Sequence, residues 1–295
     1  MTPVARASAW LDIDWRTHQR REKIDGRWLN LIDIGSGPPL LFVHGLGGCW
    51  QNWLENIPFF AGDYRVIAVD LPGFGDSPLP TEEEISIPGF ARTIDLVMDA
   101  LDVSAAAFVG HSMGGFTSVE LAISFPQRVE RLVLVSPAGL STYNDPHALL
   151  LLAQARRFKG IFNGYHALVA AHAELLARRP RLRRLEPTTN IVTRHPDRLP
   201  APFAAEFVRG LAAPGFIDGI EANLNYDYRD RLGEIACPTL IVWGKRDKVV
   251  SAKDANLYEQ LIPNARKVLF EDTGHMAMIE RPAAFNALLE EFLSE

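Results

Sequence analysis

The stretch that decides the fold of this chain is Gly110-His111-Ser112-Met113-Gly114. It begins where the apolar run at residues 105–109 ends, and a segment of helical periodicity follows it. A serine between glycines at such a junction predicts a sharp turn from a buried strand into a helix. The turn would hold the serine hydroxyl in an exposed position at the helix N-terminus. We therefore expect Ser112 to be a nucleophile.

Short apolar runs recur on both sides of this stretch and predict a sheet. They begin near residues 40, 66, 105, 132, 240 and 268. Such runs are typical of strands buried on both faces, and helical periodicity between several of them favours parallel pairing. Upstream, Asp25-Gly26 separates residues 20–24 from residues 27–34 and predicts a hairpin. We expect an α/β fold with an eight-stranded, mostly parallel sheet flanked by helices.

The long interval between the runs at 132 and 240 indicates an inserted segment, because it is much longer than one crossover helix with its loops. Its first half favours helix, and several prolines interrupt the second half. We therefore predict a helical cap at residues 138–232, placed after strand 6. Residues 1–137 and 233–295 would form the core.

The motifs together resemble those of the α/β-hydrolase family, over nearly the whole chain: His44-Gly45, the stretch around Ser112, and Gly274-His275. In that family a catalytic serine, acid and histidine follow one another along the chain. The resemblance implies that His275 is the base. It also implies that Asp247, in a Gly-x-x-Asp-x-x-Val loop after strand 7, orients the histidine.

Two other aspartates are rivals of Asp247 for the role of the acid. Asp70 precedes the serine, and Asp272 lies three residues before His275. Both are expected to hold turns.

The same resemblance implies an oxyanion hole made of two backbone amides. One is the N–H of Met113, directly after the nucleophile, and the other is the N–H of Leu46 in the loop after strand 3. We expect Gly45, Trp50 and Met276 to line the substrate pocket, with Leu46 and Met113 as further apolar walls. His44 is expected to brace the loop.

Among family members, the elbow sequence is most like that of carboxylesterases and monoacylglycerol-type lipases. The expected reaction is therefore ester hydrolysis through an acyl-enzyme, with a medium-chain or aryl ester as the small-molecule substrate. Ring-cleavage C–C hydrolases tend to have asparagine at the position of His111 and tryptophan at that of Met276. Metal-free perhydrolases usually have phenylalanine at position 111. Both remain alternatives, as does a small-molecule receptor with vestigial activity.

Composition narrows the class of protein. The formal net charge of −6 makes nucleic acid an improbable partner, and no metal-ligand spacing or cofactor fingerprint is present, so we expect no metal and no cofactor. Charged residues interrupt the first twenty positions and no apolar run approaches the length of a membrane span, about 20 residues. We expect a cytoplasmic monomer or homodimer without stable membrane insertion. The arginines at 178, 179, 181, 183 and 184 predict a solvated helix end or an anion-docking surface.

Overall fold

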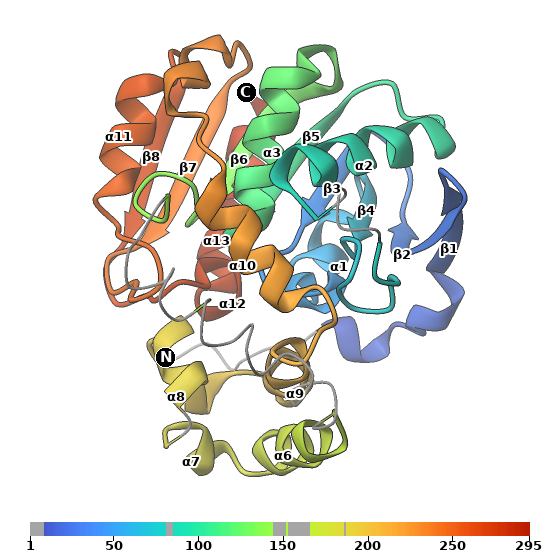
Figure 1. Cartoon of the computed structure of the whole chain (residues 1–295), viewed down its shortest axis with the longest axis vertical. Helices are drawn as coiled ribbons and strands as arrows, with labels where there is room; N and C mark the ends of the chain where they lie inside the picture. Colours follow the sequence, from blue (N-terminus) through green and yellow to red (C-terminus); the bar gives the residue numbers. More distant parts are fainter. Residues whose placement is uncertain (1–8, 81–84, 144–151, 153–165, 186) are drawn as a thin grey trace.

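The computed structural model describes residues 9–80, 85–143, 152, 166–185 and 187–295. Its centre is one eight-stranded sheet in the order β1-β2-β4-β3-β5-β6-β7-β8 (Figure 1). The strands are β1 (Gln19–Ile24), β2 (Arg27–Ile34), β3 (Pro39–Val43), β4 (Arg65–Val69), β5 (Ala106–His111), β6 (Val129–Val135), β7 (Thr239–Gly244) and β8 (Ala265–Phe270). The predicted strands are confirmed, with β6 and β8 each starting three residues before the predicted position.

The pairing of the strands also matches the prediction. β1 and β2 form an antiparallel hairpin in which Asp25 and Gly26 take φ angles of 46° and 83°. Both angles lie in the left-handed region that a tight two-residue turn requires. β2 also pairs antiparallel with β4, and the pairings from β4 through β8 are parallel.

Helices surround the sheet (Figure 1). The longer described helices are α2 (Ile87–Ala100), α3 (Met113–Ser124), α6 (His166–Arg178), α9 (Ala201–Gly210), α10 (Phe216–Asn225), α11 (Asp254–Leu261) and α13 (Pro282–Ser294). Short helices are α1 (Ile57–Phe60), α7 (Pro180–Arg183), α8 (Pro187–Val192) and α12 (Ala277–Glu280). In Figure 1, α10 crosses in front of the sheet, and α6 to α9 lie below it.

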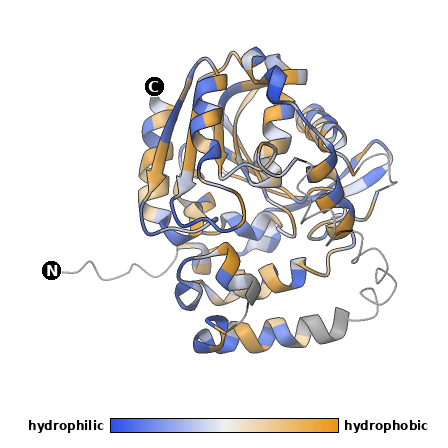
Figure 2. Ribbon diagram, turned by 60° about the vertical axis from the view of Figure 1, so that its left-hand side comes forward, coloured by the Kyte–Doolittle hydropathy of each residue, from blue (hydrophilic) through white to orange (hydrophobic). Residues whose placement is uncertain are grey.

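The central strands β3 to β7 are buried on both faces, as their continuous apolar runs predict. In β3, Leu41 and Val43 belong to one core cluster, and Leu40 and Phe42 belong to the other. Helices α2, α3 and α11 contribute to the first cluster and α13 to the second. Figure 2 shows hydrophobic residues running through the strands. Full burial of a leucine or valine side chain is worth about 1.5–3 kcal/mol, so both clusters hold the strands in register.

All described secondary structure between β6 and β7 is helical, as predicted: α6 to α10 and two 3₁₀ helices, η6 (Pro196–Arg198) and η7 (Arg229–Glu234). We refer to α6–α10 as the β6–β7 helices. Residues 144–151, 153–165 and 186 of the predicted cap lie outside the described residues. The division into a core and a cap at 138–232 remains a prediction.

One arginine of the basic cluster differs from the expectation of a solvated helix end. Arg183 is buried, and its guanidinium donates to the carbonyls of Leu176 and Leu199. Arg178, Arg181 and their exposed neighbours face solvent. Arg183 therefore ties α6, α7 and the segment before α9 together from a buried position.

Glycines allow the β6–β7 helices to lie directly on the loops that follow β3 and β4. A Cβ added to Gly210 would lie 1.6 Å from the carbonyl oxygen of Gly47. Nearby, the N–H of Gly215 donates to the carbonyl of Gly73 at 3.0 Å. We call these two backbone contacts the glycine clamp. The clamp fixes the α9–α10 corner against the predicted oxyanion loop.

We predict that Gly210→Ala lowers the melting temperature. Helix propensity alone favours alanine over glycine by about 1 kcal/mol, but the added methyl would overlap backbone at the clamp, and overpacking typically costs about 1–3 kcal/mol. Thermal denaturation followed by circular dichroism measures the change. Gly62→Ala is the matched control, because a Cβ there meets nothing within 4 Å. Equal melting temperatures for the two variants would contradict the clamp.

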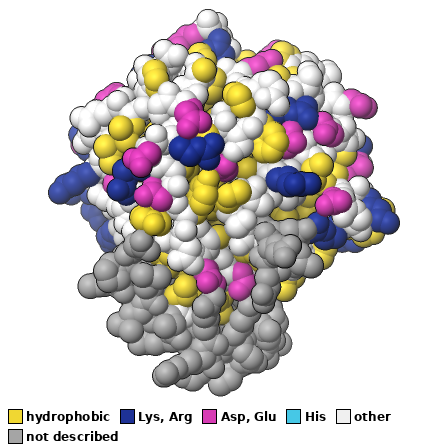
Figure 3. All heavy atoms as spheres, turned by 45° about the horizontal axis from the view of Figure 1, so that its top comes forward, with side chains coloured by type: hydrophobic (Ala, Val, Ile, Leu, Met, Phe, Trp, Pro, Cys, Tyr) yellow, Lys and Arg dark blue, Asp and Glu magenta, His cyan; other side chains and the backbone are white. Residues whose placement is uncertain are grey.

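No helix in the described part of the chain is long and apolar enough to cross a membrane. On the face shown in Figure 3, acidic and basic side chains are interspersed among hydrophobic ones.

Candidate active site

Ser112 occupies the strained turn that the sequence predicts. Its φ and ψ are 52° and −117°, outside the regions that L-residues ordinarily adopt. The turn is held on one side by the N–H of Ser112, which donates to the carbonyl of Val135 in β6 at 3.0 Å. Strained backbone of this kind clusters at functional sites.

The glycines around Ser112 let other backbone segments approach closely. A Cβ at Gly110 would lie 2.5 Å from the carbonyl oxygen of Gly114, and a Cβ at Gly114 would lie 2.3 Å from the carbonyl oxygen of Val43. Neither position has room for a side chain. The glycines therefore bring the end of β3 against the start of α3, directly beside Ser112.

His275 and Asp247 are brought together by the loops after β8 and β7. The Nδ1 of His275 lies 2.7 Å from Oδ2 of Asp247, and both side chains are almost completely buried. Because the carboxylate accepts the Nδ1 proton, the Nε2 of His275 is left as the proton acceptor. His275 and Ser112 line the same cavity.

Asp247 has a complete set of donors. In addition to His275, the indole N–H of Trp243 donates to Oδ2 at 2.9 Å, and the N–H groups of Val249 and Val250 donate to Oδ1 at 2.8 and 3.1 Å. Burial by itself would raise the pKa of Asp247, but the charge interaction and hydrogen bond with His275, together with the two amides, outweigh it. The pKa is therefore lowered, and the carboxyl is ionised at neutral pH. Sequence reasoning missed Trp243, whose apolar run indicates only a strand.

The loop after β3 lies against Ser112 and is braced by His44. The Nε2 of His44 accepts the N–H of Leu71 at 2.9 Å, so its Nδ1 donates to the carbonyl of Gly45 at 2.7 Å. Burial lowers the pKa of His44 to about 4, which keeps the ring neutral. A Cβ at Gly45 would lie 3.0 Å from Cβ of Ser112.

This placement brings the loop that carries Leu46 next to the N-terminus of α3, where Met113 is the first residue. The first N–H groups of a helix have no partner within it. The two predicted amide donors therefore belong to neighbouring segments beside Ser112.

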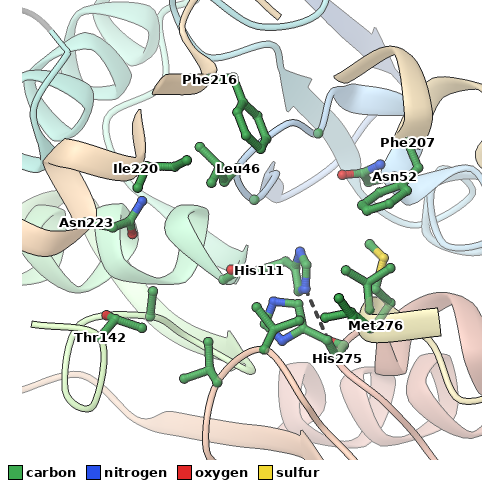
Figure 4. A pocket seen from close by; sticks show the side chains of 18 of the residues that line it. Leu46, Asn52, His111, Thr142, Phe207, Phe216, Ile220, Asn223, His275 and Met276 are labelled. Atoms are coloured by element: carbon green, nitrogen blue, oxygen red, sulfur yellow. Dashed lines mark hydrogen bonds between the residues drawn. The ribbon is translucent and has the colours of Figure 1, made fainter. Parts of the chain in front are cut away.

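A cavity of about 360 Å³ opens around these groups (Figure 4). Of the residues expected at the substrate pocket, Gly45, Leu46 and Met276 line this cavity. Its other walls are mostly apolar and come from the β6–β7 helices and the loop after β7; they include Ile191, Val192, Phe207, Leu211, Phe216, Ile220, Leu224, Val249 and Val250. The size suits a small organic molecule, and the apolar walls favour a hydrophobic one.

Trp50 is not among the residues that line the cavity, which corrects the prediction. Its ring packs on the ring of Trp15, with the two centroids 5.0 Å apart, and its backbone N–H donates to the carboxylate of Asp70. The side chain of Met113 is likewise buried in the core. Trp50 follows the oxyanion loop closely in sequence, but the 3₁₀ helix η3 (Trp50–Trp53) turns its ring toward the core.

The two rival aspartates have partners other than His275. Buried Asp70 accepts hydrogen bonds from the N–H groups of Trp50 and Asp76 and so holds two loops. Asp272 is half-exposed and pairs with Arg194 and His195, which lie between α8 and η6. Asp272 thus links these residues to the loop after β8, in addition to the turn role expected for it.

Within the described residues, no group of three or more histidine, cysteine or acidic side chains is arranged to hold a metal ion.

Comparison with known proteins supplies the family context. A family model described as the alpha/beta hydrolase fold matches residues 38–282. The chain is 34% identical over 270 residues to the dihydrolipoyllysine-residue acetyltransferase component of the acetoin cleaving system of Cupriavidus necator, covering 88% of this chain. The chain spans only 64% of that relative's length.

Two further relatives match almost end to end. The chain is 31% identical to the pimeloyl-[acyl-carrier protein] methyl ester esterase of Aeromonas hydrophila, covering 88% of this chain and 97% of the relative. It is 29% identical to the 2-hydroxy-6-oxo-6-phenylhexa-2,4-dienoate hydrolase of Burkholderia cepacia, covering 90% and 91%. Among solved structures, the enol-lactonase from Burkholderia xenovorans matches with a TM-score of 0.73 at 25% identity, covering 94% of this chain and all of that one.

Proposed function

This chain belongs to the α/β-hydrolase fold family, and from that premise we propose that it hydrolyses carboxylic esters through a serine acyl-enzyme intermediate. The observation that carries the proposal is the strained Ser112 in the same cavity as His275, whose Nδ1 lies 2.7 Å from buried Asp247. A serine hydroxyl needs such a base to become a useful nucleophile, and the base needs an orienting acid. Esterase relatives support the same reaction class.

In the first step, Nε2 of His275 takes the proton from Oγ of Ser112 as this oxygen attacks the ester carbonyl. The N–H groups of Leu46 and Met113 donate to the oxyanion that forms. A single donor of this kind is worth about 10²–10³ in rate. The C–O bond to the alcohol then breaks, and His275 returns its proton to the leaving alkoxide oxygen.

In the second step, His275 takes a proton from water, which attacks the acyl-enzyme carbonyl. The second tetrahedral intermediate breaks the bond to Ser112, whose oxygen recovers the proton, and the carboxylic acid leaves. Asp247 remains ionised throughout and holds the Nδ1–H of His275.

The apolar walls of the cavity favour medium-chain or aryl esters. We predict that turnover rises from acetate to octanoate esters, because each buried methylene contributes about 0.8 kcal/mol. Initial rates on a 4-nitrophenyl ester series from two to twelve acyl carbons measure the preference, with the acyl chain as the only variable. Equal kcat/KM for acetate and octanoate would refute it.

Hydrolysis of carbon–carbon bonds is the second candidate. The observation that favours it is the relative from Burkholderia cepacia, the 2-hydroxy-6-oxo-6-phenylhexa-2,4-dienoate hydrolase, which is 29% identical over nearly the whole chain. His111 and Met276 argue against it on the sequence. A vinylogous 1,5-diketone assayed beside the esters separates the two: faster cleavage of the diketone would favour C–C hydrolysis. Near-stoichiometric turnover of every compound would instead favour a receptor.

A further inference from the structure

Asn223 places an unpartnered polar atom in the wall of the cavity. It lies in α10, is only 8% exposed and lines the cavity. Its Nδ2 donates to the carbonyl of Gly219 at 2.7 Å, one helical turn earlier. Its Oδ1 is buried and has no hydrogen-bond partner among the described residues.

The orientation of this amide is fixed by its surroundings. If the amide were reversed, Oδ1 would face the Gly219 carbonyl oxygen, and two acceptors would be opposed. Oδ1 therefore remains the free atom. A buried acceptor without a partner costs about 1–3 kcal/mol, whereas an apolar side chain of the same shape avoids that cost.

In the part of the chain that the structure describes, no donor to Oδ1 of Asn223 offsets this cost. Figure 4 shows its amide pointing toward the cavity beside Ile220 and Leu46, and opposite the side that holds Phe207 and Met276. His275 and His111 lie between the two sides. Asn223 and Ser112 line the same cavity, so a molecule that fills the cavity past Ser112 meets the face of α10 that carries Asn223.

We propose that Oδ1 of Asn223 accepts a hydrogen bond from the substrate, so that the natural ester carries a hydroxyl or amide N–H on the part that contacts α10. Asn223 is then a specificity-determining residue. The inference rests on the proposed esterase function and adds the polarity of its substrate. A site that hydrogen-bonds a substrate donor discriminates strongly against analogues that lack it, because its own polar group is otherwise left unpaired.

The test uses matched esters that differ only in the donor. Methyl hexanoate is compared with its monohydroxy derivatives, and hexyl acetate with the monoacetates of hexanediols, by pH-stat titration. An amide arm compares N–H with N-methyl amides within chains of the same length. For the best-placed donor, wild type is expected to show kcat/KM at least tenfold above the plain ester. Asn223→Leu should reduce that ratio to one or below.

Two further measurements separate this role from a structural one. If Asn223 only supports α10, Asn223→Leu will lower the melting temperature and change all esters by the same factor; the proposal predicts a higher melting temperature and a changed ratio. Asn225→Leu, the same change at an exposed position of α10 outside the cavity lining, is the matched control and should leave the ratio unaltered. Wild type that disfavours every donor-bearing ester while still hydrolysing plain ones would overturn the inference alone. If wild type hydrolyses no ester faster than Ser112→Ala does, the proposed function itself is overturned.

Discussion

Replacing Ser112 with alanine is expected to reduce kcat for ester hydrolysis by roughly 10⁴–10⁶-fold. In a nucleophile–base–acid unit the loss of the nucleophile removes the covalent route altogether, and what remains derives from the oxyanion donors and binding. Alanine fits the turn, because its Cβ occupies the same place as that of serine. The folded state should therefore persist, which thermal denaturation can confirm.

The exposed serine Ser104 offers a matched control. Ser104→Ala removes a hydroxyl from the loop before β5 and should leave kcat unchanged. When the wild-type reaction is quenched with acid during turnover, mass spectrometry of the protein should show the acyl group on Ser112. Ser112→Ala that retains more than about 1% of wild-type kcat would contradict nucleophilic catalysis by this residue.

Asp247→Asn is expected to reduce kcat by about 10⁴-fold, although the change is nearly isosteric. The buried carboxylate accepts the Nδ1–H of His275 and the indole N–H of Trp243 on the same oxygen. An amide nitrogen at that position would donate to His275 and leave the proton on Nε2, where it cannot accept one from Ser112. A loss of less than tenfold would refute the role of Asp247.

Asp272→Asn is the control for Asp247→Asn, because it makes the same chemical change in a half-exposed aspartate close to His275 in sequence.

The pH dependence of the free energy of unfolding provides a second measurement on Asp247→Asn. The pKa of Asp247 lies below its ordinary value of 3.8 in the folded protein, so its contribution is present above that value and is lost as the pH falls through the lowered pKa. Asp247→Asn should remove this part of the acid dependence, while retaining the rest.

The core of the fold was predictable because its signals are local. Each strand of the parallel sheet is a short apolar run, and the carboxyl ends of such strands meet at one edge. The turn at Ser112 was equally predictable, since only glycines tolerate the contacts seen at Gly110 and Gly114. These features depend on a few consecutive residues.

The cavity walls were not predictable in the same way. Phe207, Phe216, Ile220 and Asn223 come from helices whose positions depend on tertiary packing, and their apolar periodicity indicates only that one face is buried. Trp50 shows the converse error: proximity in sequence to the loop after β3 suggested the pocket, but η3 turns the ring away. The acceptor role of Asn223 needs a three-dimensional account of its hydrogen bonds.

The glycine clamp has a consequence for how new specificities could be built on this scaffold. The helices that line the cavity rest through Gly210 on the loop after β3, which would position an oxyanion donor, and through Gly215 on the loop after β4. A chimera that imports these helices from a relative must therefore also import compatible residues at positions 47 and 73. Substrate selectivity and catalytic rate therefore depend on the same backbone contacts. Recombination should succeed where the crossover takes both sides of the glycine clamp from one parent.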